Sequence, residues 1–263
     1  RRPPRSTPKP SSAASDVYKR QVQPSLALVD FMVEFKGQSS HASADPWNAR
    51  SASDALELYT HGINSYREHI KPSVRIHYHI QDAGQVVNVV PDYSRIWVRV
   101  RDITREGLAP VYDQVRKMAG GAAIMANVDH KISLISGIHD LLPNRTGGVV
   151  MQKNLEALGD IQYSEEEIMF ALEMQENNGK PKIGIDGKIR PLRETLESPG
   201  GGSTDVGDVS YNVPVVSLAA TTAPKGVPWH SWSVVASSGM SIGHKGMLHA
   251  TKALGMTMVD IFN

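Results

Sequence analysis

The sequence predicts a mixed α/β chain: a ferredoxin-like β-α-β-β-α-β domain followed by a second region that is only part of an α/β domain. Along residues 29–137 the hydrophobic period changes from two to about 3.6 and back, as strands and helices alternate. The order of these elements is that of two split βαβ units, which fold into one sheet with both helices on one face. After residue 141 the sequence becomes rich in helices and loops and offers a single short strand.

The expected strands of the first domain show alternating apolar and polar side chains. In VDFMVEFKG, Phe31, Val33 and Phe35 share one face, and VRIHYHIQ, SRIWVRVRD and residues 131–136 complete a sheet of four antiparallel strands. The inward-facing side chains of the middle two segments are Ile76, Tyr78, Ile80, Ile96, Val98 and Val100. The opposite face should be solvated or meet a partner, because it carries Arg75, His77, His79, Arg95, Trp97, Arg99 and Arg101.

Two helices are expected in the first domain, over residues 49–70 and 105–118. The first has an apolar stripe at helical spacing, formed by Ala52, Leu56, Tyr59, Ile63 and Tyr66. Asp45, Pro46 and Asn48 form a plausible start for it.

The second region should contain helices over residues 149–158, 165–175 and 246–262, and a long surface loop over residues 177–199. GGGSTDVGDVS is expected to be a glycine-rich loop, VPVVSLAA a short buried strand and GVPWHSW a tight loop. One strand is too little sheet for a self-sufficient α/β domain, so we expect a half-domain with an under-covered sheet face that exposes apolar side chains.

Residues 1–21 differ from the rest of the chain. They are rich in Pro, Ser, Lys and Arg, they lack the apolar core of a secretory signal, and DVYKRQ resembles a translated cloning linker. We therefore expect a disordered, non-native segment that takes no part in the fold.

Composition excludes several classes of function. A net charge of +1 gives no reason to expect nucleic acid or an anionic membrane as a partner. No run approaches the roughly 18 apolar residues that a membrane span needs. The chain has no cysteine, which excludes disulfides and thiolate metal sites and is compatible with a reducing, cytoplasmic location.

The ten histidines suggest a search for metal ligands. No HExxH motif is present, and His77 and His79, two apart on a strand, fit a polar sheet face more simply than a metal pair. His230 is different, because its loop follows a buried strand and precedes the last helix, a position where α/β enzymes place functional groups. From position alone, His230 is either a ligand or the donor of a structural hydrogen bond. The glycine-rich loop lacks the lysine of a phosphate-binding loop, so it fits a close backbone approach better.

Taken together, the motifs resemble a known family. FKGQSSHASADPWNARSASDAL and GQVVNVVPDYSRIWVRVRD resemble the lid domain of the dinuclear-metal aminoacylase and carboxypeptidase superfamily. LLPNRT, GSTDVGDVS, GVPWHSW and SIGHKGM resemble its amidohydrolase members. The resemblance covers residues 25–263, and it implies a lid and dimerisation domain over residues 25–138 and the C-terminal part of a catalytic domain over residues 139–263. The first half of the catalytic domain, with most metal ligands and the glutamate base, would precede this chain.

The resemblance also implies roles for particular residues. The intact enzyme would bind two divalent metal ions, zinc or manganese, with His230 as one ligand, and the fragment would hold none stably. His41 would reach the partner's site and steady the scissile carbonyl, and Asn88 would contact the substrate or the rim of the site. Ser203, Thr204 and Asp205 would line the site through the glycine-rich loop.

The implied activity is hydrolysis of a C–N amide bond in an N-acyl or N-aroyl amino acid such as p-aminobenzoyl-glutamate. The implied partner is a second copy or a related second subunit, bound through the lid, and the fragment alone should be inactive. The alternative is a non-catalytic dimerisation or scaffold module derived from this family. A histidine-rich segment and a Glu-Glu pair upstream of Val22 would favour the enzyme.

Overall fold

The computed structural model describes residues 24–192 and 202–263. Its residues form two compact units, which we call the sheet unit (residues 25–141 and 202–209) and the helical unit (residues 142–192 and 210–263). The segment 1–21, for which we expect disorder, lies outside the described residues, as does part of the loop expected over residues 177–199.

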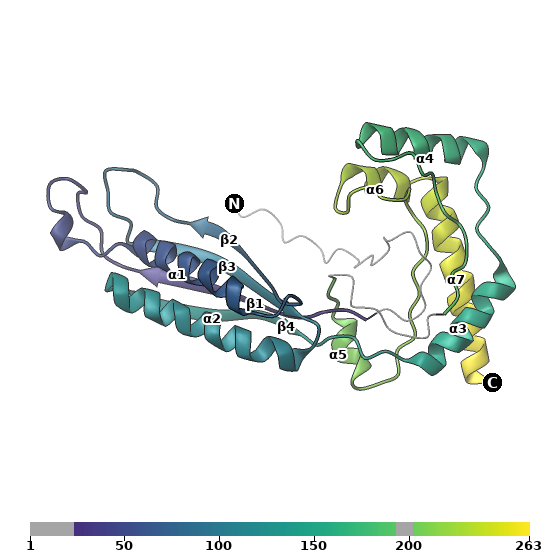
Figure 1. Ribbon diagram of the computed structural model, residues 1–263, viewed down its shortest axis with the longest axis horizontal. Helices are drawn as coiled ribbons and strands as arrows, with labels where there is room; N and C mark the ends of the chain where they lie inside the picture. The colour runs from purple at the N-terminus through teal and green to yellow at the C-terminus, as the bar shows by residue number, and fades with distance from the viewer. Residues whose placement is uncertain (1–23, 193–201) are drawn as a thin grey trace, which may run out of the picture. The chain divides into compact units, whose positions relative to one another are not determined.

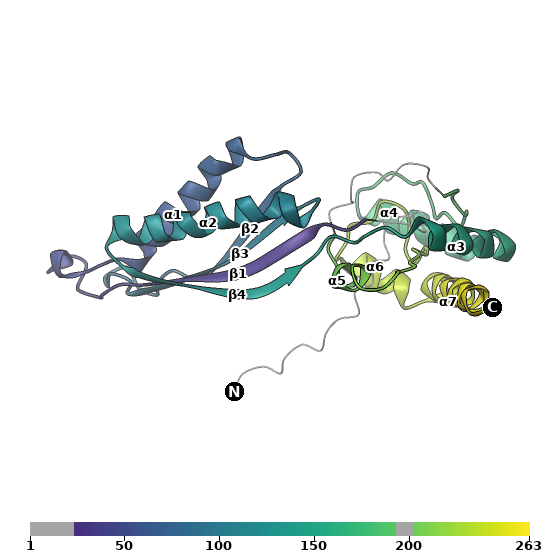
Figure 2. The same ribbon diagram turned by 90° about the horizontal axis from the view of Figure 1, so that it is seen from below.

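The sheet unit is built on a four-stranded antiparallel sheet with the strand order β2-β3-β1-β4. Its strands are β1 (Ala27–Lys36), β2 (Arg75–Asp82), β3 (Tyr93–Asp102) and β4 (Asp129–Ile138). Figures 1 and 2 show both long helices of this unit, α1 (Ala52–Tyr66) and α2 (Arg105–Ala126), on the same face of the sheet. The expected β-α-β-β-α-β arrangement is confirmed.

The core of the sheet unit lies between the sheet and these two helices. Phe31, Val33 and Phe35 of β1 are completely buried there, against Tyr59 and Ile63 of α1. Ile80, which we expected to face inward, is 41% exposed. It lies on the edge strand β2 just before a shift in register, where the inward face is no longer covered.

Both helices differ from expectation at one end. Residues Pro46–Asn48 form a separate 3-10 turn, and α1 begins after Ser51, whose side chain accepts the Asp54 N–H. Helix α2 does not stop at residue 118 but continues through two glycines to Ala126. Burial of Ala122 and Ala123 offsets the low helix propensity of glycine, and the helix ends at Asn127 with φ of 53°.

The outer face of the sheet is partly covered by its own side chains. Asp30 and Met32 of β1 point to this face yet are only 4% and 6% exposed. Arg99 of β3 reaches across and forms a two-point ion pair with Asp30, at 2.7 and 2.6 Å. Burial, together with Arg101, Arg99, Arg67 and Arg75, lowers the pKa of His77.

The helical unit contains the expected helices in longer forms. They are α3 (Arg145–Leu158), α4 (Glu165–Asn177) and α7 (Ser241–Phe262). Helix α6 (Trp232–Ser238) is not among the expected helices, because it begins at the end of GVPWHSW, which we expect to be a tight loop. The short α5 (Val206–Ser210), most of which belongs to the sheet unit, ends the glycine-rich segment where we expect only a loop. Helix α7 starts five residues earlier than expected. A Cβ on Gly243 would lie 2.1 Å from the Ser238 carbonyl oxygen, so the lack of a side chain allows this close packing.

The prediction of a strand at VPVVSLAA is wrong. Residues 213–220 form no strand, because among the described residues of the helical unit there is no neighbouring strand for them to pair with. The described part of the helical unit holds no sheet, so the expected under-covered sheet face is not found there either. Exposed apolar side chains do occur, but on α7, where Met247, Met258 and Phe262 are all more than half exposed. No helix of the described chain combines the length and the apolar content that crossing a membrane requires.

An ion pair with a buried carboxylate joins α4 to α7. Lys245 Nζ lies 2.6 Å from Glu167 Oε2, and the Glu167 side chain is 6% exposed. The Ser164 N–H donates to the same carboxylate at 2.7 Å as part of a capping box. Burial raises the pKa of Glu167, but hydrogen bonds from Lys245, Ser241 and the Ser164 N–H outweigh it and lower that pKa to about 2.

Replacing Lys245 with methionine should destabilise the helical unit by about 3 kcal/mol at pH 7, because a buried carboxylate loses its partner. Since the folded pKa lies below the usual 4.5, this carboxylate stabilises the fold above pH 4.5 and ceases to do so as the pH falls toward 2. Urea unfolding between pH 3 and 7 should therefore show a smaller acid-side loss in Lys245→Met than in the parent.

The matched control is Lys182→Met. Lys182 also pairs with a glutamate of α4, Glu176, at 2.7 Å, but both side chains are more than half exposed. This substitution should change stability by less than about 1 kcal/mol. Equal losses in the two variants would show that burial of the Glu167 pair is unimportant.

Candidate functional site

Two loops at one end of the sheet unit bring together the candidate residues His41 and Asn88. The loop after β1 and the loop between β2 and β3 are joined by main-chain hydrogen bonds, Ala42 N–H to the Asn88 carbonyl (2.9 Å) and Val90 N–H to the Ser40 carbonyl (3.0 Å). His41 and Asn88 are both exposed. Residues that are far apart in the sequence thus occupy neighbouring backbone positions at the tip of this unit.

The His41 imidazole is held in one tautomer. Its Nδ1 accepts the N–H groups of Ser43 and Ala44, each at 3.2 Å, and the Ser43 hydroxyl lies 3.3 Å from the same nitrogen. A nitrogen that accepts backbone N–H groups carries no proton, so in the neutral ring the proton is on Nε2. His41 therefore presents an N–H donor to a ligand at the tip.

Asp45 fixes the turn that carries His41. Its Oδ1 accepts the His41 N–H at 3.1 Å, and its carbonyl accepts the Ser40 hydroxyl at 3.0 Å. Sequence reasoning assigned Asp45 to the start of a helix and missed this role. The available signal was its spacing of four residues from His41, which suits an aspartate that caps a short turn.

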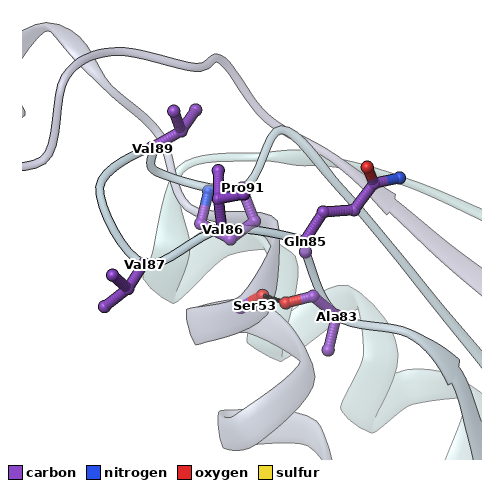
Figure 3. A pocket seen from close by; sticks show the side chains of 8 residues that line it. Ser53, Ala83, Gln85, Val86, Val87, Val89 and Pro91 are labelled. Carbon is purple, nitrogen blue, oxygen red and sulfur yellow. Dashed lines mark hydrogen bonds between the residues drawn. The ribbon is translucent and has the colours of Figure 1, made fainter.

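The tip around these polar groups is apolar. Val86, Val87 and Val89 are 57%, 98% and 40% exposed, and Trp47 is 76% exposed. The three valines line an open pocket of about 370 Å³ (Figure 3), whose floor is fixed by a 2.6 Å hydrogen bond from Ser53 Oγ to the Ala83 carbonyl. Neither His41 nor Asn88 is among the residues that line this pocket.

His230 belongs to the helical unit, in the loop before α6. Its φ is 55°, in the left-handed region, and it is exposed. No hydrogen bond from the described residues reaches its imidazole. The neighbouring Trp229 and Trp232 are 37% and 60% exposed, so neither is buried against the ring in this chain.

The segment with Ser203, Thr204 and Asp205 lies at the other end of β1 from His41. The Leu26 N–H donates to the Gly202 carbonyl at 2.8 Å, and the His139 N–H donates to Asp208 Oδ1 at 3.1 Å. A Cβ on Gly207 would lie 2.1 Å from the His139 carbonyl oxygen, so here the glycine does allow a close backbone approach. These three residues are therefore not brought together with His41 and Asn88 within the sheet unit.

The described residues do not by themselves form a metal centre. No three His, Cys, Asp or Glu side chains converge anywhere in residues 24–192 and 202–263. His230 offers a single imidazole, which is not enough to hold a divalent ion in a protein site.

Comparison with known proteins gives a consistent result. Residues 27–124 match the family described as the peptidase dimerisation domain. The chain is 33% identical over 262 residues to one of the subunits of p-aminobenzoyl-glutamate hydrolase from Escherichia coli (strain K12), a match that covers 90% of this chain and 54% of that protein. It is 25% identical over 241 residues to Xaa-Arg dipeptidase of Homo sapiens, covering 90% and 48%.

Among solved structures, the aminobenzoyl-glutamate utilization protein from Klebsiella pneumoniae is similar with a TM-score of 0.57. This match has 15% identity and covers 94% of this chain and 51% of that one. At such identity the likeness shows the fold alone. The chain spans about half the length of the curated relatives it matches.

Proposed function

We propose that the chain is part of a longer amidohydrolase, because residues 27–124 match the peptidase dimerisation domain and the similar curated proteins are hydrolases. Its substrate would be an N-acyl or N-aroyl amino acid, with p-aminobenzoyl-glutamate as the first candidate. The observation that carries the proposal is the His41 imidazole, held as an N–H donor beside Asn88 on an exposed apolar tip.

His41 and Asn88 would act on the carbonyl oxygen of the scissile amide. The oxygen gains negative charge as the bond is attacked, and an N–H donor already in place stabilises that charge without reorganising. The surrounding valines and Trp47 would exclude water and strengthen these hydrogen bonds. In a dimer formed through the sheet unit, this tip would serve the site of the partner, which is either a second copy or a related subunit.

We further propose that the longer enzyme holds two divalent metal ions, zinc or manganese. His230 would supply one ligand, and the other ligands would lie outside the described residues. Such ions polarise a carbonyl and provide hydroxide near neutral pH. Ser203, Thr204 and Asp205 would line the substrate site through the backbone of their loop. The 263-residue chain alone would bind no metal stably and would be inactive.

The alternative is a scaffold module that dimerises without catalysis, which the lack of a metal cluster in the described residues would suit. The test is to supply the purified longer enzyme with zinc or manganese and assay p-aminobenzoyl-glutamate and a dipeptide ending in arginine. We expect at least about tenfold higher kcat/KM for the aroyl substrate, because a flat apolar group is worth about 1–3 kcal/mol on an apolar surface. Absence of hydrolysis with either metal would favour the scaffold.

A further inference from the structure

The loop of residues 225–231, which carries His230 and leads into α6, is held at both ends by side chains from the C-terminal end of α4 and its capping residue. At one end, Gln175 Nε2 donates to the Lys225 carbonyl at 2.7 Å. At the other, Asn178 Nδ2 donates to Ser233 Oγ at 2.8 Å, and Ser233 Oγ lies 3.1 Å from Asn178 Oδ1. Figure 1 shows α4 and α6 side by side, with this loop between them in the sequence.

Gln175 is an anchor whose polar groups are fully used. It is 0% exposed, and besides Lys225 its Nε2 donates to the Gly184 carbonyl at 2.9 Å. Its Oε1 accepts the N–H groups of Ile183 and Gly184, both at 2.9 Å. An amide side chain has two donors and two acceptor positions, so every one is occupied. A side chain held in this way cannot rotate, and it fixes the Lys225 carbonyl in place.

Asn178 and Ser233 form the second anchor. Asn178 follows α4 as its capping residue, and its Nδ2 also donates to the Met174 carbonyl at 2.7 Å. Ser233 is 0% exposed at the start of α6. Within the loop, Ser231 Oγ donates to the Pro228 carbonyl at 2.6 Å. Side-chain hydrogen bonds thus connect both ends of the loop to the end of α4, and a further hydrogen bond stabilises the loop between them.

The backbone at His230 needs such support. Among the described residues, the only positive-φ positions that are not glycine are Asn127 and His230. Asn127 ends α2, where a left-handed residue completes the helix terminus. His230 does not end a helix. A left-handed conformation persists at a non-glycine residue only when the surrounding structure imposes it. Backbone strain of this kind is found most often at functional sites.

We propose that Gln175 and Asn178 are positioning residues, which hold the His230 loop so that the imidazole projects, without an internal hydrogen bond, in a conformation ready for a ligand. The proposal rests on the proposed role of His230, but the mechanical part can be measured separately. The proposal predicts that removing the hydrogen bonds of either anchor makes the loop mobile without unfolding the helices that it contacts.

The first experiment is amide hydrogen exchange on the full chain. In Asn178→Ala and Ser233→Ala, the amides of residues 226–232 should exchange at least about tenfold faster, while the α3 and α7 amides keep their rates. Gln175→Met should do the same, and if that variant does not fold, the other two still decide the matter. The matched control is Asn154→Ala, since Asn154 is also a buried amide with two side-chain hydrogen bonds, at 3.1 Å to Thr257 and 2.8 Å to Asp260, but it joins α3 to α7.

Unchanged loop exchange in Asn178→Ala, or loop exchange that rises equally in Asn154→Ala, would overturn the anchoring. The second experiment measures kcat and KM of the same variants in the longer enzyme. We expect Asn178→Ala to lower kcat about 10- to 100-fold with KM nearly unchanged, and Asn154→Ala to alter neither. A freed loop with normal kcat would overturn the positioning role. Failure of the role proposed for His230 itself would instead appear as normal activity in His230→Ala, with loop exchange in the Asn178 variant still raised.

Discussion

Replacing His230 with alanine in the longer enzyme should lower amide hydrolysis by more than about a hundredfold, which is beyond the range for residues that only support a metal ligand. The enzyme should also lose a large part of one equivalent of bound metal. The dimer should remain intact, because His230 belongs to the helical unit and the match to the peptidase dimerisation domain covers residues 27–124. Metal analysis, steady-state kinetics and the mass in solution test the three parts.

The matched control is His244→Ala. His244 is also an exposed histidine of the helical unit, but it lies on the regular helix α7. Its replacement should leave metal content and rate near those of the parent. Full metal content together with activity within about tenfold of the parent in His230→Ala would show that His230 is not a ligand.

Most of the sheet unit follows from local patterns. Alternation at Phe31, Val33 and Phe35 predicts β1, and the helical stripe through Tyr59 and Ile63 predicts α1, because in both cases burial repeats with the geometry of the element. The order of these elements then restricts the topology to one familiar arrangement. Helix ends were less predictable, since burial of Ala122 and Ala123 carries α2 past glycines that would otherwise favour a stop.

The helical unit shows where local reasoning fails. VPVVSLAA has strand composition, but a strand also needs a neighbour, and composition does not say whether one is present. Gln175 and Asn178 look like solvated residues at the end of a charged helix. The burial of Gln175 and the bonds of both residues to partners some 50 positions away arise from tertiary contacts. The left-handed backbone at His230 is likewise invisible in the sequence.

The residues of the candidate site were named from the sequence and their roles stay predictions, whereas their geometry was not foreseen. His41 and Asn88 were each assigned to the site from a family resemblance, since periodicity leaves both in loops. The tautomer of His41 depends on the N–H groups of Ser43 and Ala44, whose direction is set by the turn that Asp45 closes. The hydrogen bonds seen in the structure identify this loop histidine as an N–H donor and give its orientation, which the sequence does not.

Replacing His41 with alanine should lower kcat by about 10²- to 10³-fold with little change in KM, the loss expected when one donor to a developing oxyanion is removed. Asn88→Ala should have a smaller effect in the same direction. The control is His61→Ala, since His61 is an exposed histidine of the same unit on helix α1. Normal kcat in His41→Ala would exclude His41 from the reaction.

Mixing the inactive His41→Ala and His230→Ala enzymes then tests whether His41 acts in the partner's site. If the enzyme is a homodimer in which each site takes His230 from one subunit and His41 from the other, a mixed dimer has one site with both substitutions and one with neither. Random exchange of equal amounts makes half of the dimers mixed, so activity should return to about one quarter of the parent. If both residues served the same subunit, every site in the mixture would keep one defect and no activity would return. Recovery therefore requires that the tip of one sheet unit complete the site of the other subunit.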